Sequence, residues 1–296
     1  MPDRDRYIPG VPCWVDTNQP DPEAAVAFYS GLFGWELTDV MPPGSEQKYF
    51  MARLQDRDVA GVNGIPEGAP PMATWNTYIW VDSADQAATK VRDAGGTVLM
   101  EPFDVPEAGR MAVLADPEGA VFCVWQPGQH RGAQLVNEPG ALNFNGLATR
   151  NVEAAKSFYG AVFGWDTLTL DGGLQAWTLA AYGDHLEEGD PGLRERIVGF
   201  GVPARFADVV ATINPIDGSD SDTPPHWSVT FAVDDADAAA AKATELGGKV
   251  IAPPFDAPWV RMTLLSDPAG ATFIASKFVP ENRDLGTQAD STVSAA

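Results

Sequence analysis

The feature that most constrains this chain is that it repeats itself. The segment DPEAAVAFYSGLFGW at 21–35 returns as NVEAAKSFYGAVFGW at 151–165, shifted by 130 positions. The Val-Asp pair at 81–82 returns at 233–234, shifted by 152. An internal repeat fixes the architecture before any local pattern does. The sequence therefore predicts two similar halves, each with a first and a second module, and an insertion between the modules of the second half.

Each module reads as a strand, a helix and then two or three further strands. Asp21 is a good helix N-cap and Pro22 suits the first helical position. Gly34 falls where a left-handed helix stop is expected. Between them, apolar residues follow the spacing of one helical face: Ala25, Phe28, Tyr29, Leu32 and Phe33. In each second module, DPEG at 116–119 or DPAG at 267–270 provides turn chemistry between the last two strands. This order predicts an α+β fold.

The repeat and the composition also set the expected boundaries. Two domains are the default for 296 residues. We expect a first domain over 8–126, a Pro- and Gly-containing linker over 127–140, and a second domain over 141–280. The insertion is expected around 183–225, with a short helix after Asp190-Pro191. Residues 281–296 are expected to form a polar, disordered tail.

The charge argues against two classes of partner. The net charge is −22, whereas nucleic acids and anionic membranes attract basic surfaces. No apolar run approaches the roughly 18 residues of a membrane span, and MPDRDRYIPG lacks the apolar stretch of a secretory signal. Two cysteines give no disulfide framework. We expect an acidic cytoplasmic protein whose partner is a small molecule, either monomeric or homodimeric.

Two motifs carry a resemblance to a known family. FY-x₃-FGW at the end of the first helix and DP-x-G before the last strand together resemble the vicinal oxygen chelate superfamily. That superfamily includes glyoxalase I, bleomycin-resistance proteins, extradiol dioxygenases and fosfomycin-resistance enzymes. The resemblance covers about residues 8 to 280 and is nearest to actinobacterial two-domain glyoxalase-like proteins. It implies tandem glyoxalase-like domains, in each of which two βαβββ modules form a cup-shaped mixed sheet.

The resemblance also implies where a metal would be held, namely on the first strand of each module and on the last strand. These positions carry Trp14, Asn76 and Cys123 in the first half, and Phe144, Ser228 and Ile274 in the second. None is His, Asp or Glu, and a catalytic metal needs about three such ligands. His130 lies in the linker and His185 in the insertion, while His226 reads as a strand-edge residue. We therefore expect no metal and no cofactor.

Strand alternation extends the candidate site beyond those positions. Asp16 should face the same way as Trp14 and could act as a general acid or base with Tyr78. Asp16 could equally cap a turn at the end of its strand, and Tyr78, Trp80 and Trp125 could be plain core. The expected ligand-binding residues are Trp14, Asp16, Asn76, Tyr78, Cys123 and Trp125, with a second and poorer cup at Phe144, Ser228, Thr230 and Ile274.

Two functions follow from these expectations. The first is metal-free binding of a hydrophobic or aromatic small molecule, as in bleomycin-resistance relatives, with a role in secondary metabolism or antibiotic resistance. The alternative is an enzyme. It would be either a metal-free acid–base catalyst using Asp16 and Tyr78, or a glyoxalase-type lyase or dioxygenase. Because the expected ligand positions lack metal ligands, the metal-independent form is favoured. In a third interpretation, one half has lost its cup and only supports the other.

Overall fold

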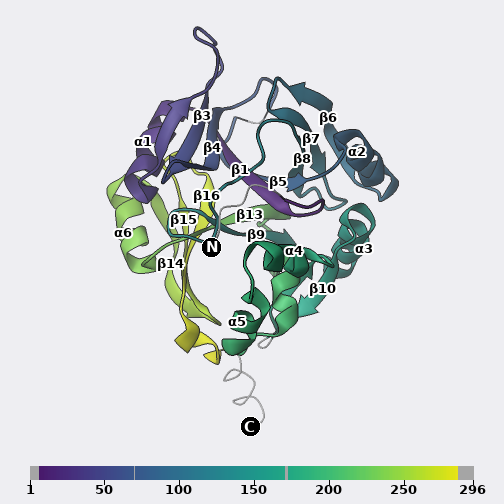
Figure 1. Ribbon diagram of the computed structural model, residues 1–296. Coiled ribbons are helices and arrows are strands. Elements are labelled where there is room, and N and C mark those ends of the chain that lie inside the picture. The colour runs from purple at the N-terminus through teal and green to yellow at the C-terminus, as the bar shows by residue number, and fades with distance from the viewer. Residues whose placement is uncertain (1–6, 70, 171–172, 286–296) are drawn as a thin grey trace. The chain divides into compact units, whose positions relative to one another are not determined.

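Each of the four sequence modules folds as a strand, a helix and three strands in the computed structural model, which describes residues 7–69, 71–170 and 173–285 (Figure 1). The first module is β1 (Pro12–Gln19), α1 (Pro22–Phe33), β2 (Glu36–Asp39), β3 (Tyr49–Leu54) and β4 (Arg57–Gly64). The second is β5 (Thr74–Trp80), α2 (Ala84–Asp93), β6 (Thr97–Val105), β7 (Gly109–Ala115) and β8 (Val121–Pro127).

The second half repeats this order with additions. Its first module is β9 (Leu142–Thr149), α3 (Val152–Phe163), β10 (Asp166–Thr169), β11 (Gln175–Thr178) and β12 (Val209–Pro215). Its second module is β13 (His226–Ala232), α6 (Ala236–Glu245), β14 (Lys249–Ala257), β15 (Val260–Ser266) and β16 (Thr272–Phe278). No helix among the described residues has the length and apolar character needed to span a membrane.

The insertion contributes helices between β11 and β12. They are α4 (Tyr182–Gly189), α5 (Leu193–Gly199) and the 3-10 helix η2 (Ala204–Asp208). The helix expected after Asp190-Pro191 is α5, whereas α4 and η2 were not predicted. β12 lies inside the range assigned to the insertion but completes the module. The expected disordered tail, 281–296, begins inside a 3-10 helix, η3 (Pro280–Asn282), and residues 286–296 lie outside the described residues.

The strands form two mixed sheets with the same order, so the predicted α+β tandem architecture is confirmed. The first sheet runs β2-β3-β4-β1-β5-β8-β7-β6 and the second β10-β11-β12-β9-β13-β16-β15-β14. β1 pairs with β4 in parallel, as β12 does with β9. Hairpins such as β7–β8 and β15–β16 are antiparallel. The turn in each of these two hairpins is the DP-x-G motif, as predicted.

By compactness, the chain divides into two units that each combine segments from both halves. One comprises Met1–Trp14, Thr77–Gly132 and Phe144–Ser228, and the other Val15–Asn76, Ala133–Asn143 and Val229–Ala296. We call them the 77–228 unit and the 15–76/229–296 unit. Within the former α2 lies beside α3, and within the latter α1 lies beside α6 (Figure 1). The domain boundaries expected from sequence stay a prediction.

The repeated helix ends have the geometry that their residues predict. Asp21 accepts a hydrogen bond from Ala24 N at 3.0 Å, and Asn151 accepts one from Ala154 N at 3.0 Å. Each carboxylate or amide satisfies a backbone N–H that has no partner within the first helical turn. Gly34 ends α1 at φ 72°, in the left-handed region that glycine adopts without steric cost.

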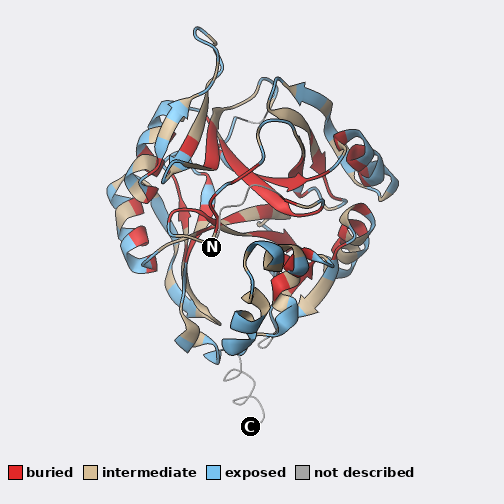
Figure 2. Cartoon of the chain, viewed as in Figure 1, coloured by how far each residue is buried: buried red, intermediate tan, exposed pale blue. Residues whose placement is uncertain are grey.

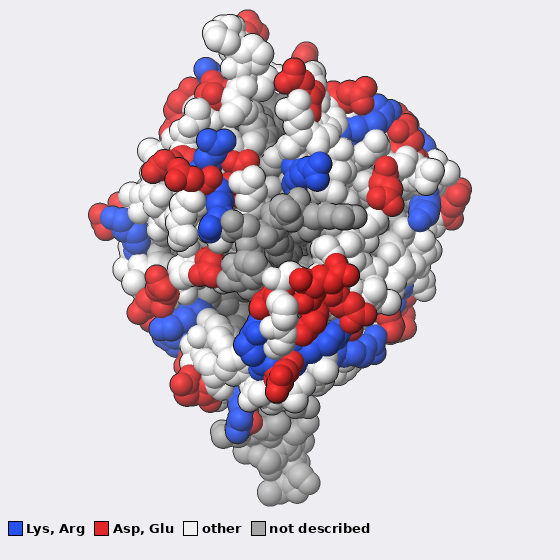
Figure 3. All heavy atoms as spheres, viewed as in Figure 1, with Lys and Arg blue, Asp and Glu red and all other residues white. Residues whose placement is uncertain are grey.

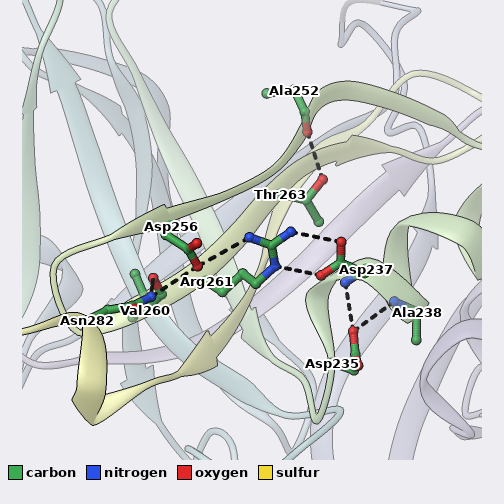
Figure 4. A network of polar contacts seen from close by, with 9 residues as sticks. All are labelled: Asp235, Asp237, Ala238, Ala252, Asp256, Val260, Arg261, Thr263 and Asn282. Atoms are coloured by element: carbon green, nitrogen blue, oxygen red, sulfur yellow. Dashed lines mark hydrogen bonds and ion pairs between the residues drawn. The ribbon is translucent and has the colours of Figure 1, made fainter. Parts of the chain in front are cut away.

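An arginine that recurs in the repeat, Arg110 in the first half and Arg261 in the second, connects each second-module helix to its neighbouring edge strand. Arg261 on β15 donates from Nε and Nη2 to Asp237 at 2.6 and 2.9 Å, and its Nη1 lies 3.2 Å from Asp256 on β14 (Figure 4). Arg110 pairs in the same way with Asp85 and Asp104. These ion pairs are half-exposed, so they orient the helix more than they stabilise the fold. On the face of the molecule drawn in Figure 3, acidic and basic side chains lie next to one another in several places.

The DP-x-G aspartate of the second half has a structural role beyond the turn. Asp267 is 1% exposed, and its Oδ1 accepts the backbone N–H groups of residues 269, 270 and 271. Its Oδ2 accepts from Gln19 Nε2 at 2.6 Å and from Tyr29 Oη at 3.0 Å. Trp75 Nε1 donates in turn to Tyr29 Oη at 3.1 Å. One carboxylate thus joins the first and last modules inside the 15–76/229–296 unit.

Asp116 joins the second and third modules inside the 77–228 unit, with fewer partners. Its Oδ2 accepts from Tyr159 Oη at 3.1 Å, and Trp227 Nε1 donates to that hydroxyl at 3.0 Å. Burial raises the pKa of both Tyr29 and Tyr159 well above the ordinary value, so both remain protonated donors.

Figure 2 shows how burial is concentrated in the central strands and on the inner faces of the helices.

Asp116 gives a pH-dependent contribution to stability. Burial raises the pKa of its carboxyl, even though the backbone N–H of Ala120 and the Tyr159 hydroxyl act in the opposite direction. A raised carboxyl pKa means that the stabilising contribution is complete below about pH 4 and is lost as the pH rises through the folded-state value. We expect the difference in unfolding free energy between the unmodified protein and Asp116→Asn to fall from pH 4 to pH 7. Urea unfolding at each pH measures it, and a difference that stays flat or grows contradicts the assignment.

Candidate functional site

One face of β1, β4 and β5 carries a buried carboxylate in a polar cluster. Asp16 is 2% exposed; its Oδ1 accepts from Asn76 Nδ2 at 2.8 Å and its Oδ2 from Tyr49 Oη at 3.3 Å. Gln19 and Trp75, of opposite parity on β1 and β5, bond toward Asp267 and α1. Because successive strand residues point to opposite faces, Asp16 and Asn76 face away from α1. We call this surface the Asp16 face.

Register places two more amides and a glycine on the Asp16 face. Asp16 pairs with Gly61, and Asn18 with Asn63. Tyr49 pairs with Asn63 from the other side. A Cβ on Gly61 would lie 2.3 Å from Tyr49 Oη and 3.0 Å from Asp16 Cβ. Only glycine at this position leaves room for the tyrosine hydroxyl to reach the carboxylate.

The aromatic residues expected to line the site gather in the 77–228 unit around a histidine. Trp14 meets His130 edge to face, with ring centroids 4.4 Å apart, and Trp125 lies 5.7 Å from the same ring. Trp125 Nε1 donates to the His130 backbone carbonyl at 3.0 Å. Tyr78 packs against Trp125 at 6.4 Å. Trp14, Tyr78, Cys123 and Trp125 are all buried, and the linker contributes to this cluster through His130.

Among the described residues, the corresponding face of the second half has no carboxylate. Gly146 stands where Asp16 stands in the repeat, paired with Thr212. A Cβ on Gly146 would lie 2.5 Å from Asn214 Nδ2 and 2.6 Å from Thr212 Oγ1. Ser228, the counterpart of Asn76, donates to the Gly146 carbonyl at 3.1 Å. The glycine thus lies on β9 in the second half, whereas it lies on β4 in the first. The polar groups that the structure describes on this face are amides and hydroxyls, and none of them is ionisable.

The remaining predicted second-site residues are divided between the two units. Phe144, in the 77–228 unit, meets Phe206 of η2 edge to face at 6.4 Å, so the insertion packs on this wall. Thr230 and Ile274, in the 15–76/229–296 unit, are directly paired across β13 and β16. Thr230 is half-buried, whereas Ser276, two residues beyond Ile274, is buried. The Phe144 contact comes from outside the module and was not predicted.

The residues at the family's metal positions do not fit a metal. Trp14, Phe144 and Ile274 have no side-chain atom that coordinates a metal, since they carry an indole, a phenyl ring and an aliphatic chain. The amide of Asn76 already donates a hydrogen bond to Asp16. Across 7–69, 71–170 and 173–285, no three or more His, Cys, Asp or Glu side chains are arranged to hold a metal ion. Divalent transition metals are held by His, Cys or carboxylate ligands. No chemical step is therefore assigned to a metal in this protein.

Sequence reasoning missed Tyr49, Asn63 and Phe206. Tyr49 and Asn63 reach the Asp16 face through the pairing of β3 with β4, and β4 was not predicted at all. An Arg-Asp-Val-Ala-Gly-Val-Asn-Gly segment at 57–64 alternates weakly, but its buried Val59 and Val62 are separated by small residues. The signal that could have found it was the module count, because a third strand is required after each helix.

Comparison with known proteins agrees with this fold. The model of the Glyoxalase/Bleomycin resistance protein/Dioxygenase superfamily matches residues 14–124 and 141–274. A Mycobacterium tuberculosis protein named "Putative glyoxylase CFP32" is 42% identical, covering 95% of this chain and all of that protein. The anthracycline biosynthesis protein DnrV of Streptomyces peucetius is 36% identical, covering 90% of this chain and 93% of its own length.

Solved structures with the same fold are more distant in sequence. The Mn(II)-bound glyoxalase from Novosphingobium aromaticivorans aligns with a TM-score of 0.57 at 17% identity, covering 91% of this chain and 83% of that one. The 2,3-dioxygenase LapB from Pseudomonas sp. KL28 aligns with a TM-score of 0.57 at 12% identity, covering 92% and 93%. These similarities are evidence of the fold alone.

Proposed function

The chain belongs to the glyoxalase/bleomycin resistance protein/dioxygenase superfamily, and from that premise we propose that it binds a polycyclic aromatic small molecule without a metal. Two streptomycete relatives over 30% identical are named as anthracycline biosynthesis proteins, and anthracyclines are flat polycyclic aromatics. The observation that carries the proposal is the Asp16 face. There a buried carboxylate, a phenol and amides stand near positions where the family resemblance places metal ligands.

The proposal assigns the ligand to the first half. The Asp16 face offers charge-assisted hydrogen bonding, which is about twice as strong as a neutral contact. On the equivalent face of the second half, around Gly146, the described polar groups are neutral, and Ser228 is already bonded to the Gly146 carbonyl. Small-molecule sites combine apolar walls with a few well-placed polar groups. The polar requirement is met by Asp16, Tyr49 and Asn76.

The test uses a matched pair of variants, Asn76→Ala and Ser228→Ala, which change equivalent positions of the repeat. Chelator-treated protein is titrated with 2,3-dihydroxyanthraquinone and binding is followed by tryptophan fluorescence. We expect one site, and an affinity about tenfold lower in Asn76→Ala, because Asp16 loses the amide that holds its carboxylate in place, and ordering an unheld side chain on binding costs about 0.5–1.5 kcal/mol. Ser228→Ala should bind normally. Binding that requires added manganese, nickel, zinc or iron, or that is weakened only by Ser228→Ala, contradicts the proposal.

A second candidate function, metal-free acid–base catalysis, is favoured by the hydrogen bond from Tyr49 Oη to Asp16 Oδ2, 3.3 Å long. A carboxylate within reach of a phenol can accept a proton from a bound ligand and return it. The two functions are distinguished by incubating the same ligand in heavy water with the unmodified protein and with Asp16→Asn. The quantity measured is the deuterium content of the ligand, and not fluorescence. A catalyst exchanges a carbon-bound proton of the ligand for deuterium and loses this exchange in Asp16→Asn, whereas a binding protein shows no exchange in either form.

A further inference from the structure

The linker that follows β8 brings a histidine ring back onto the sheet, within the 77–228 unit. The centroid of the His130 ring lies 4.4 Å from that of Trp14 and 5.7 Å from that of Trp125. The two indoles are 3% and 5% exposed, whereas His130 is half-buried. A half-buried imidazole therefore lies on two buried indoles. We call residues 128–132 the strap.

The strap is attached by backbone hydrogen bonds near the surface. The N–H groups of Gly128 and His130 donate to the Ala108 carbonyl at 2.8 and 3.1 Å, and Gln129 N donates to the Glu107 carbonyl at 3.0 Å. Gly128 and Gln129 are exposed, so water can replace these bonds when they break. Segments with few buried contacts and exposed backbone hydrogen bonds open locally while the rest of the protein stays folded.

Both ends of the strap contact the sheet closely. Gly132 has a φ of 83°, in the left-handed region, and a Cβ there would lie 2.5 Å from the Cys13 carbonyl oxygen. Trp125 Nε1 donates to the His130 carbonyl at 3.0 Å. The indole that lies beneath the imidazole thus also holds the backbone of the strap, so a group that displaces the ring also weakens the attachment of the segment.

From these contacts we propose that the strap is a lid, and that the His130 imidazole occupies the place of a ligand ring until the ligand displaces it. This inference rests on the proposed function and adds the conformational step that binding requires. A protein whose open state is only partly populated binds with an affinity reduced by that fraction. A ring that covers more of the two indoles than an imidazole does replaces it most readily, so the strap favours flat polycyclic ligands over single rings.

The second half closes its equivalent position with a fixed ring. Phe144, on the first strand of its module, meets Phe206 of η2. Asp208, at the end of η2, accepts from Gly183 N of α4 at 2.9 Å and from Arg194 Nη2 of α5 at 3.1 Å. Three elements of the insertion are thus joined around one carboxylate. The ring from the insertion is a wall, and the lid is assigned to the first half.

Hydrogen exchange without ligand tests whether the strap opens by itself. In the unmodified protein, we expect the amides of Gly128, Gln129 and His130 to exchange about a hundredfold faster than those of the central strand β8. Low concentrations of urea should leave the rate in the strap unchanged, because local opening exposes little surface. This measurement needs no variant, so it stands even if a substitution prevents folding.

Binding is tested by titrating chelator-treated protein with 2,3-dihydroxyanthraquinone. In His130→Ala we expect the affinity to rise about fivefold, because one ring pair shifts an equilibrium by about that factor and no ring has to be displaced. His185→Ala, the matched change on α4 of the same unit, should leave the affinity unchanged. The ligand should speed exchange in the strap but not at Val279, the counterpart of Gly128, which donates to the Trp259 carbonyl at 2.7 Å.

Each outcome decides for or against the lid. Exchange in the strap as slow as in β8 overturns it, whether or not a ligand binds. An affinity that stays equal or falls in a folded His130→Ala protein means that the imidazole is a structural ring or a ligand contact, and it overturns the lid while binding itself stands. If the compound binds to neither protein, the proposed function and the lid are both wrong.

Discussion

Asp267→Ala is expected to lower the free energy of unfolding by about 3–5 kcal/mol, the range for removing one partner from a buried charged network. The substitution removes an acceptor used by Gln19, Tyr29 and three backbone N–H groups. Gln19 and Tyr29 are themselves buried, at 1% and 0% exposure, so water cannot replace the lost bonds. Urea unfolding measured by circular dichroism gives the value.

The matched control is Asp116→Ala in the other unit. Asp116 accepts from Tyr159 and from two backbone N–H groups, and no glutamine bonds to it among the described residues. Its burial also raises its pKa, which means that its charged form is less well compensated. We expect a loss of about 2 kcal/mol. Equal losses in the two variants would show that the Gln19 contact contributes nothing.

Gly61→Ala is expected to disrupt the Asp16 face with little change elsewhere. The added methyl would lie 2.3 Å from Tyr49 Oη, so the tyrosine must leave the carboxylate. Overpacking of this kind costs about 1–3 kcal/mol, and the affinity for 2,3-dihydroxyanthraquinone should fall together with stability. Ligand titration and urea unfolding on the same preparation measure both effects.

Gly64→Ala, three residues along the same strand, is the control for Gly61→Ala. The nearest atom to its added methyl would be Pro22 Cγ at 3.8 Å, an ordinary contact. Its backbone conformation is one that alanine adopts, so stability should change by no more than about 0.5 kcal/mol. If Gly61→Ala behaves like Gly64→Ala in both measurements, Tyr49 does not depend on the space above Gly61.

The repeat in the sequence was enough to predict the fold because the repeated residues include those that start and end helices and form turns. Asp21 and Gly34 cap a helix wherever they occur in that spacing, and Asp267 with Pro268 makes a turn. These are local interactions, and local interactions can be read from spacing. The four-module α+β architecture follows from them.

The candidate site was less predictable because it depends on which strands pair. Asp16 and Asn76 were placed on one face by alternation, and they do share a hydrogen bond. Tyr49 reaches Asp16 only because β3 pairs with β4 and β4 with β1. His130 reaches Trp14 only because the linker returns to the sheet that it leaves. Neither contact leaves a periodic trace in the sequence.

The division of the chain into units that mix the two halves has a consequence for biosynthesis. Tyr29 and Asp267 are 238 positions apart, yet they share a hydrogen bond in one compact unit. During synthesis, the hydrogen bond from Tyr29 to Asp267 therefore cannot form until the last module has left the ribosome. Contacts this distant in sequence fold slowly, and the waiting module exposes apolar surface in the meantime. A nick in the linker would not release two finished domains, since each fragment would carry parts of both units.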